Sequence, residues 1–261
     1  MSYMSAASLP AVIVDCMRPG PADGKVLGSQ GDYNQLTKGG GHGDYNTIVL
    51  APYSVQEYAD FAPLSFELAE KYNNPVVVAS DGMIAKMMEN VELPERIEPT
   101  GRKPWAVDGM NGRGYHNDIT TCGDGPEQWE QFNLNLQAKY AKIRENEQRW
   151  EEINTEDADI IIVAFGSLSR VCLDAMKLAR EQGLKVGMIR PITIWPFPEK
   201  AFEKYVGKGK KFFVTELNAG QMVNDVKLAV NDNASVEFYG RLGGMTPTPV
   251  EICNKICELY K

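Results

Sequence analysis

The sequence predicts an α/β fold in which an incomplete first domain is followed by a complete, doubly wound second domain. Short apolar runs typical of buried strands alternate with segments of helical period over residues 10–81, and again from residue 157 onward. The second half holds four strand–helix units, which is typical of a doubly wound sheet, but the first half holds only three clear strands. We therefore expect domains over 1–125 and 157–261, joined by a long linking helix over 126–156.

The first domain is expected to contain a parallel sheet. Its strands are the continuous apolar runs Pro10–Asp15, Thr47–Pro52 and Pro75–Asp81. Residues 54–72 carry apolar side chains at helical spacing, and Ser54 and Glu57 form a capping box. Pro63 should kink this helix. A strand, helix and strand with short connections form a βαβ unit, so the last two strands should be parallel.

The residues that follow Asp81 predict a short helix. Asp81 is expected to cap residues 83–91, with a role in a pocket as the alternative. Met83, Met87 and Met88 have helical spacing within this segment, so we expect them in the core.

An irregular excursion and a long helix come next. Residues 90–125 are rich in Pro, Gly, Asn and charge and lack a sustained period. Asp124 in "CGDGP" fits a helix N-cap better than a metal ligand. The pattern from Pro126 to Ile153 contains no Gly and no internal Pro, so it predicts one helix of roughly 40 Å.

The second domain is expected to alternate four strands with four helices. The strands are Asp159–Ser167, Lys185–Pro191, Lys211–Leu217 and Ser235–Leu242, and the helices are 169–183, 198–206, 220–230 and 248–260. Thr248, Pro249 and Glu251 supply the N-cap, the first-turn proline and the capping-box acid of the last helix.

Two polar residues and two aromatic residues stand out at strand ends of the second domain. Glu216 and Asn218 should cap the next helix, with a contact at an interface as the alternative. Trp195 and Phe197 lie between prolines, and we assign them to a docking surface; local core packing is nearly as well supported.

Composition excludes several classes of protein. The net charge of the 261 residues is -8, which argues against a nucleic-acid groove or an anionic membrane surface as partner. No apolar run approaches the roughly 20 residues of a membrane span, and the start lacks the features of a signal peptide. Five scattered cysteines fit a reducing cytoplasm, and the pair Cys253 and Cys257 in "CNKIC" reads as two ordinary thiols.

A loop from Arg18 to Tyr45 is the strongest local signal of function. It contains eight glycines and follows a buried strand. Loops of this length without structure of their own are usually functional or disordered. The carboxyl ends of strands in an open α/β sheet are where ligands bind, so we expect a site at this loop.

Several blocks together resemble a known family. "SYMSAASLPAVIVDCMRPGP", "SQGDYNQLTKGGGHGDY", "IVLAPYSVQEYADFA" and "ASDGMIAKMMENVELP" look like the pyrimidine-binding domain of the alpha-type subunit of 2-oxoacid:ferredoxin oxidoreductases, which depend on thiamine diphosphate. "IIIVAFGSLSR", "IRPITIWPFP" and "VTELNAGQMVNDVKLAV" look like the transketolase-C-terminal-like domain that follows it. The resemblance covers nearly the whole chain. "QGDY" with "KGGGHGDY" is most similar to subunits for branched-chain 2-oxoacids such as 3-methyl-2-oxobutanoate, and the 2-oxoglutarate subunits are close relatives.

The resemblance implies a division of labour among subunits. It implies oxidative decarboxylation of a 2-oxoacid, transfer of the acyl group to coenzyme A, and delivery of electrons through iron–sulfur clusters to ferredoxin. A partner beta subunit would hold the thiamine diphosphate phosphates and Mg²⁺, and the clusters would lie on other subunits of the gamma or delta type. No metal ligand is expected on this chain, and we expect it to be inactive alone.

The sequence also departs from the family. Family members carry a "YPITP"-type substrate loop and a glutamate for the aminopyrimidine ring in a segment that we expect to be missing here. A catalytically silent, truncated subunit that acts as a scaffold is therefore an alternative to an active one. A nucleotide-binding protein is a third reading, but it would require a phosphate loop that the glycines do not form.

The resemblance places substrate-binding residues in the first part of the loop. "RPGPADGKVL" stands where the family has "RGGPSTGLPT", and Arg18 occupies the position of the arginine that pairs with the substrate carboxylate. Pairing of Arg18 with Asp15 or Asp32 is the alternative. Asp23 and Leu27 replace hydroxyl residues, which should favour an apolar substrate side chain and disfavour a dicarboxylic acid.

The second part of the loop contains candidates for cofactor contact. The backbone amides of Gly39, Gly40 and Gly41 could approach the cofactor or a neighbouring subunit closely. His42 could transfer a proton, since histidine titrates near neutrality. The alternative for His42 is a hydrogen bond to the loop itself or to a partner chain.

Overall fold

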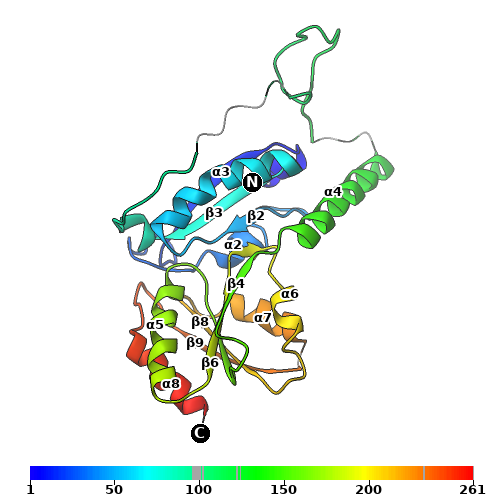
Figure 1. Cartoon of the computed structure of the whole chain (residues 1–261). Helices are drawn as coiled ribbons and strands as arrows, with labels where there is room; N and C mark the ends of the chain where they lie inside the picture. The colour runs from blue at the N-terminus through cyan, green and yellow to red at the C-terminus, as the bar shows by residue number, and fades with distance from the viewer. Residues whose placement is uncertain (96–100, 102, 122, 124, 232, 261) are drawn as a thin grey trace.

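The computed structural model describes residues 1–95, 101, 103–121, 123, 125–231 and 233–260. Within these residues the strands form two sheets, one of four strands and one of five. Figure 1 shows the part built mainly from the first half of the chain above the part built from the second half. The predicted α/β class is confirmed.

The first sheet joins strands from both halves of the chain. Its order is β1 (Ala11–Met17), β3 (Pro75–Asp81), β2 (Ile48–Leu50) and β7 (Thr193–Trp195). β1, β3 and β2 are parallel, as the βαβ pattern predicts, and Met17 pairs with Asp81, so β1 and β3 end level. β7 pairs antiparallel with β2. β7 was not predicted because it is short and its partner lies far away in the chain.

The second sheet has one unexpected strand. Its order is β4 (Trp150–Ile153), β6 (Val186–Pro191), β5 (Ile160–Val163), β8 (Lys211–Glu216) and β9 (Ser235–Gly240). The last four are parallel, as predicted, but β4 pairs antiparallel with β6. The expected single helix to Ile153 is therefore wrong: α4 (Pro126–Asn146) ends at Asn146. The residues after it pair with a distant strand, and local periodicity does not encode such pairing.

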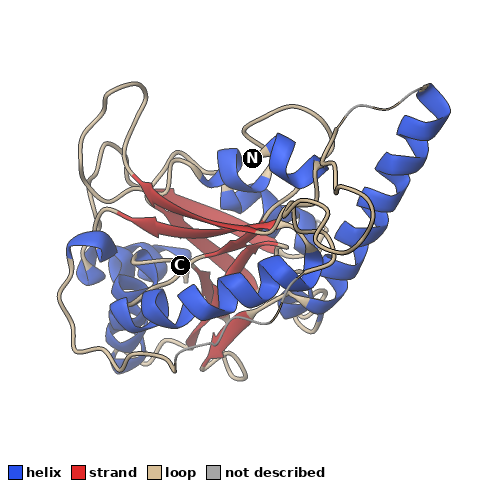
Figure 2. Cartoon of the chain, turned by 90° about the horizontal axis from the view of Figure 1, so that it is seen from above, coloured by secondary structure: helices blue, strands red, loops and turns tan. Residues whose placement is uncertain are grey.

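Helices surround the strands. The remaining helices are α1 (Ser2–Ala6), α2 (Tyr33–Thr37), α3 (Val55–Tyr72), the 3₁₀ turn η1 (Ile84–Lys86), α5 (Leu168–Glu181), α6 (Lys200–Glu203), α7 (Met222–Val230) and α8 (Pro249–Leu259). The hydroxyls of Ser54 and Thr248 accept the predicted capping bonds from the backbone N–H of Glu57 and Glu251. α3 continues through Pro63. Figure 2 shows α4 reaching out from the body.

The helix expected over residues 83–91 is only the single turn η1. Met88 is 98% exposed, so the prediction that it packs in the core is wrong. Beyond η1 the segment runs toward the start of α3 and toward α5, where Glu89 is bound. Its carboxylate accepts from the backbone N–H of Val55 (3.0 Å) and from Arg170 Nη1 (2.6 Å).

Trp195 and Phe197 are core residues and do not form a docking surface. They are 6% and 9% exposed. The Trp195 ring meets Tyr140 edge-on at 5.8 Å between centroids, and Phe197 stacks on Phe202 at 5.6 Å. The docking interpretation is therefore wrong, and the alternative of core packing is confirmed. Inclusion of Trp195 in β7 explains its burial.

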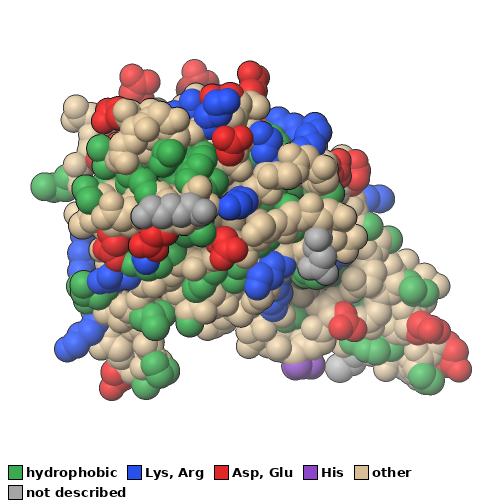
Figure 3. Space-filling model, turned by 90° about the horizontal axis from the view of Figure 1, so that it is seen from below, with side chains coloured by type: hydrophobic (Ala, Val, Ile, Leu, Met, Phe, Trp, Pro, Cys, Tyr) green, Lys and Arg blue, Asp and Glu red, His purple; other side chains and the backbone are tan. Residues whose placement is uncertain are grey.

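The distribution of charged side chains and the state of the cysteines agree with what the composition predicts. On the face shown in Figure 3, Lys and Arg side chains are scattered among acidic and hydrophobic groups. Cys16, Cys172, Cys253 and Cys257 are free thiols. Cys122 and Asp124, and with them the predicted cap at Asp124, lie outside the described residues. None of the helices in the described ranges has the length and apolar content that a bilayer crossing needs.

A buried guanidinium ties the second sheet to α3. Arg190 of β6 is 3% exposed. It donates to both carboxylate oxygens of Glu57 (2.7 and 3.0 Å) and to Glu151 of β4 (2.9 Å). It also lies 4.0 Å from the centroid of the Tyr53 ring. Because α3 packs against β1 and β3, this cluster fixes one half of the molecule against the other.

We expect Arg190→Met to lower the melting temperature by about 10 °C, because loss of the buried cation leaves the partly buried Glu57 carboxylate and the more exposed Glu151 carboxylate without their ion-pair partner. Thermal unfolding followed by circular dichroism measures the shift. Lys177→Met is the matched control, since Lys177 pairs with Asp174 on the exposed surface of α5 and should shift the melting temperature by no more than about 2 °C. Equal shifts in the two variants would contradict this account.

Candidate functional site

The carboxyl ends of the two sheets face each other. Asp81, the last residue of β3, accepts from the backbone N–H of Met83 (2.8 Å) and Ile84 (3.2 Å) through one carboxylate oxygen. The predicted capping role of Asp81 is therefore confirmed. Its other oxygen accepts from the backbone N–H of Ser167, beyond β5, at 3.4 Å. Asp81 thus connects the edge of one sheet to the edge of the other.

Gln30 closes the gap between the two edges. It is fully buried. Its Nε2 donates to the carbonyl of Phe165 (2.7 Å) beyond β5, and its Oε1 accepts from the backbone N–H of Leu217 (2.9 Å) beyond β8. Its backbone N–H donates to the Leu217 carbonyl (3.1 Å), and its carbonyl accepts from Asn218 Nδ2 (2.8 Å). Four hydrogen bonds therefore join one residue of the loop to two strand ends of the second sheet.

Residues 29–38, which we call the inter-sheet segment, are ordered by buried contacts. The Tyr33 hydroxyl donates to Asp225 Oδ2 of α7 at 2.5 Å, and Lys38 also pairs with Asp225. The Tyr33 ring lies 5.5 Å from that of Phe165. Burial raises the pKa of Tyr33 above its ordinary value, so the hydroxyl keeps the proton that it donates. The middle of the long loop is therefore structural.

Of the two polar residues expected to cap α7, Glu216 does so, whereas Asn218 bonds to the turn before the helix. Glu216 is fully buried, and its carboxylate accepts from the backbone N–H of Met222 (2.8 Å) and Val223 (3.0 Å). Burial raises its pKa despite these bonds. Asn218 Oδ1 accepts from the backbone N–H of Gly220 at 2.8 Å. Asn218 therefore orders the turn before α7 and also contacts Gln30.

Residues 18–28, which we call the Arg18 turn, precede the inter-sheet segment and lie at the surface. Arg18 Nη1 donates to the Asp23 carbonyl (2.6 Å) and Nη2 to the Ala22 carbonyl (3.1 Å). Among the described residues Arg18 forms no ion pair with Asp15 or Asp32. Within the described residues the exposed guanidinium is held by two neutral carbonyls of its own turn, which a carboxylate can displace.

Leu27 contacts the second half of the chain. A Cβ at Gly244 would lie 2.6 Å from Leu27 Cβ, and a Cβ at Gly82 would lie 2.6 Å from the Leu27 carbonyl. Both glycines are therefore required for the close approach of this turn. Leu27 remains 44% exposed, and Leu242 and Met245, which flank Gly244 in the chain, are also exposed. The Arg18 turn is thus bordered by apolar side chains.

The glycine stretch (residues 39–43) lies near the amino ends of the parallel strands of the first sheet, opposite to the carboxyl ends where the Arg18 turn lies. His42 precedes the amino end of β2, whereas Arg18 follows the carboxyl end of the parallel strand β1. The structure therefore does not bring His42 and Arg18 together. The Gly41 N–H donates to the Tyr45 hydroxyl (2.9 Å), and a Cβ at Gly41 would lie 2.8 Å from Ser2 Oγ. Packing within the chain thus already requires Gly41.

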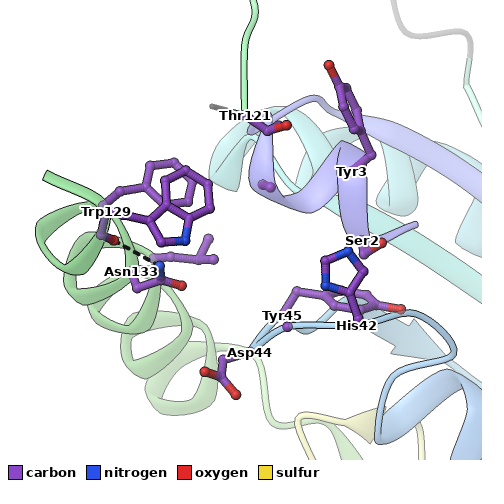
Figure 4. Close-up of a pocket in the computed structure, with 12 residues that line it drawn as sticks. Ser2, Tyr3, His42, Asp44, Tyr45, Thr121, Trp129 and Asn133 are labelled. Carbon is purple, nitrogen blue, oxygen red and sulfur yellow. Dashed lines mark hydrogen bonds between the residues drawn. The ribbon is translucent and has the colours of Figure 1, made fainter. Parts of the chain in front are cut away.

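His42 lines a cavity of about 450 Å³ between this stretch, α1 and α4. Figure 4 shows His42 and Tyr45 on one side and Trp129 and Asn133 on the other. Trp129 stacks on Phe132 at 4.7 Å between ring centroids. His42 is exposed at the rim.

The described residues fit the carboxylate of a small acid better than a diphosphate with its metal. Within the described ranges no three His, Cys, Asp or Glu side chains converge on a position for a metal ion. At the edge that carries Arg18, Lys86 Nζ donates to the Val26 carbonyl at 2.7 Å, so it too binds the loop. Arg18 provides the planar fork that recognises a carboxylate.

Asp15 of β1 is a half-buried acid close to this edge. Its Oδ2 atom is buried and has no hydrogen-bond partner among the described residues. Burial, and then repulsion from Asp32, raise its pKa to about 6. From the sequence, Asp15 was expected only as a possible partner of Arg18, because the pattern of one strand does not show that a carboxylate oxygen will lack donors.

Comparison with known proteins identifies the protein family to which this chain belongs. Residues 1–153 match the family described as pyruvate flavodoxin/ferredoxin oxidoreductase, thiamine diphosphate-binding. Residues 158–252 match pyruvate:ferredoxin oxidoreductase core domain II. The chain therefore belongs to the family of 2-oxoacid oxidoreductase subunits, and the predicted resemblance and fold are confirmed.

Individual proteins of the same family are similar to this chain over nearly its whole length. The chain is 44% identical over 260 residues to ketoisovalerate oxidoreductase subunit VorB of Methanothermobacter marburgensis, covering 99% of this chain and 73% of the relative. It is 36% identical over 275 residues to 2-oxoglutarate synthase subunit KorA of Methanocaldococcus jannaschii, covering 96% and 74%. Its structure resembles a 2-oxoglutarate:ferredoxin oxidoreductase from Magnetococcus marinus, solved with 2-oxoglutarate, coenzyme A and succinyl-CoA bound. The TM-score is 0.78 at 25% identity, over 99% of this chain and 50% of that one.

We expect Asp15→Asn to raise the melting temperature at pH 8 by about 3–5 °C and to leave it unchanged near pH 4. The folded-state pKa of about 6 lies above the ordinary aspartate pKa of 3.8. The folded chain therefore binds this proton more tightly than the unfolded chain, and stability is lost as the pH rises through about 6. The asparagine amide of the variant carries no charge at any of these pH values, so the variant does not lose stability in this way. Thermal unfolding between pH 4 and 8 tests this, with the exposed Asp60→Asn as control; a gain that does not vary with pH would contradict it.

Proposed function

We propose that this chain is the alpha-type subunit of a thiamine-diphosphate-dependent 2-oxoacid:ferredoxin oxidoreductase that acts on a branched-chain 2-oxoacid such as 3-methyl-2-oxobutanoate. The observation that carries the proposal is the 44% identity to a ketoisovalerate oxidoreductase subunit over 99% of the chain. The 2-oxoglutarate synthase subunit from the same organism is 34% identical. The apolar border of the Arg18 turn supports the same choice, because it suits an aliphatic side chain.

The remaining parts of the reaction belong to other components. Thiamine diphosphate, when bound in the assembled enzyme, supplies the nucleophilic carbon and the electron sink for loss of CO₂. We assign its phosphates and Mg²⁺ to a beta subunit and the iron–sulfur clusters to other subunits of the gamma or delta type. Coenzyme A accepts the acyl group and ferredoxin accepts the electrons. We place the complex in the cytoplasm.

In this proposal Arg18 binds and orients the substrate. Its Nη atoms exchange the carbonyls of Ala22 and Asp23 for the two oxygens of the substrate carboxylate. A charge-assisted pair is stronger than a bond to a neutral carbonyl, so the exchange is favourable. Leu27 contacts the aliphatic end of the substrate, and the Asp23 carboxylate repels a second carboxylate.

The glycine stretch has a separate role in the proposal. His42 and the amides of Gly39, Gly40 and Gly41 lie at the amino edge of the first sheet, away from Arg18. We assign them to a contact with the cofactor or with a neighbouring subunit in the assembly, where His42 can hold or transfer a proton.

The test of the proposed function is an assay of the assembled complex with coenzyme A, thiamine diphosphate, Mg²⁺ and an electron acceptor. We expect kcat/KM for 3-methyl-2-oxobutanoate to exceed that for 2-oxoglutarate by at least about tenfold, because the site favours an aliphatic group by more than 1.4 kcal/mol. The isolated chain should form no acyl-CoA. A preference for 2-oxoglutarate, or turnover by the isolated chain, would refute the proposal.

We expect Arg18→Ala in the assembled complex to raise KM for the 2-oxoacid by about 10- to 100-fold, because a charge-assisted, bidentate contact is lost. Arg18→Lys should recover only part of this, since an ammonium lacks the planar fork. Lys25→Ala, which removes another exposed cation of the same turn, should leave KM within about twofold. Steady-state kinetics of the three variants measure the effect, and equal values for Arg18→Ala and Lys25→Ala would count against Arg18.

A further inference from the structure

We infer that Gln30 is a positioning residue that fixes the Arg18 turn in place for substrate binding. The inference rests on the proposed function of Arg18. It adds a residue from the inter-sheet segment that does not touch the substrate and acts through the loop that does.

The surroundings of Gln30 select an uncharged amide. One end of the side chain must donate, to the Phe165 carbonyl (2.7 Å), and the other must accept, from the Leu217 N–H (2.9 Å). Gly166, next to Phe165, has φ +58°, and a Cβ there would lie 3.2 Å from Gln30 Nε2. The two strand ends therefore approach the amide closely from both sides. A side chain that lacks either the donor or the acceptor leaves a buried backbone group unpaired.

The position of the Arg18 turn depends on this contact because the turn is held at its two ends. Arg18 continues directly from β1. At the other end Ser29 Oγ donates to the Leu217 carbonyl at 3.1 Å, and Gln30 makes its four bonds. Between these ends Leu27 rests against Gly244. Arg18 and most of the turn are exposed, and the Lys86 Nζ bond to the Val26 carbonyl is also exposed. The buried bonds of residues 29 and 30 therefore contribute most to how tightly the turn is held.

A loosened turn should weaken binding more than chemistry. The guanidinium must lie at a fixed distance and angle to donate to both carboxylate oxygens, and this pre-organisation is lost when the far end of the loop moves. Loss of a contact made equally in the ground state and the transition state raises KM and leaves kcat unchanged. A defect in folding alone would lower the amount of active complex and leave KM unchanged.

The test is Gln30→Met and Gln30→Glu in the assembled complex. Gln30→Met keeps the length and loses both polar contacts, and we expect KM for 3-methyl-2-oxobutanoate to rise about tenfold with kcat within about threefold. In Gln30→Glu the introduced carboxyl can donate to the Phe165 carbonyl only when protonated. Burial and the nearby acids Asp81 and Glu216 should raise its pKa. We therefore expect KM close to the wild-type value at pH 6 and about tenfold higher at pH 8, after correction for the wild-type pH profile.

Gln137 provides the matched control. Its Nε2 also donates to a backbone carbonyl of the long loop, that of Asp44 (2.8 Å), but from an exposed position on α4. Gln137→Met and Gln137→Glu should leave KM within about twofold at both pH values. Unchanged KM in Gln30→Met would overturn the inference. If Gln30→Met does not assemble, Gln30→Glu purified at pH 6 decides: a KM that does not change between pH 6 and 8 overturns it.

Hydrogen exchange separates this inference from the proposed function. We expect peptides within residues 18–31 to exchange about tenfold faster in Gln30→Met complexes without substrate, while peptides within β3 stay unchanged. If the wild-type complex turns over no 2-oxoacid, the proposed function fails, and faster exchange still shows that Gln30 holds the turn. Unchanged exchange would show that Gln30 does not hold it, whatever the substrate is.

Discussion

The structure depends on hydrogen bonds that satisfy the buried strand ends where the two sheets meet. The carbonyl of Phe165 and the N–H and carbonyl of Leu217 lie beyond the last ladder bonds of β5 and β8 and are cut off from water. Unpaired backbone groups in such a place cost a few kcal/mol each. Gln30 and Ser29 supply the partners from the first half of the chain. The same bonds that join the sheets therefore fix the path of the loop.

This constraint divides the long loop into parts with different roles. The inter-sheet segment is buried and structural, with Tyr33 held by Asp225. The Arg18 turn before it is exposed and held at its ends. The glycine stretch after it packs against α1, at the opposite edge of the sheet. A ligand-binding turn between two anchored ends can be both accessible and well positioned, which is the usual arrangement of binding loops on an α/β scaffold.

Much of the fold could be predicted from the sequence, because local patterns encode it. Apolar runs identified the parallel strands β1, β2 and β3. Ser54 and Thr248 correctly predicted the starts of α3 and α8. β4 and β7 were missed, since each is a short strand whose partner is distant in the chain. Trp195 was assigned to a surface because its proline neighbours suggested an exposed loop, whereas its pairing in β7 buries it.

The candidate site could be predicted only in outline. The position of Arg18 at the carboxyl end of a strand follows from its place after an apolar run. The expectation that this run is buried is wrong, because β1 is an edge strand and Val14 is 58% exposed. The roles of Gln30 and Gly244 could not be found in this way, because each depends on the approach of a segment from the other half of the chain. The same limit applies to Asp15, whose raised pKa results from burial and from Asp32. The division into domains at 125 and 156 stays a prediction.

The most direct test of the central claim is a high-resolution structure of the assembled complex with the 2-oxoacid bound. We predict that both Nη atoms of Arg18 leave the carbonyls of Ala22 and Asp23 and lie about 3 Å from the substrate carboxylate, with the bonds of Gln30 to Phe165 and Leu217 unchanged. A structure in which the Arg18 side chain points to bulk solvent, far from the substrate and the thiamine ring, would contradict the account.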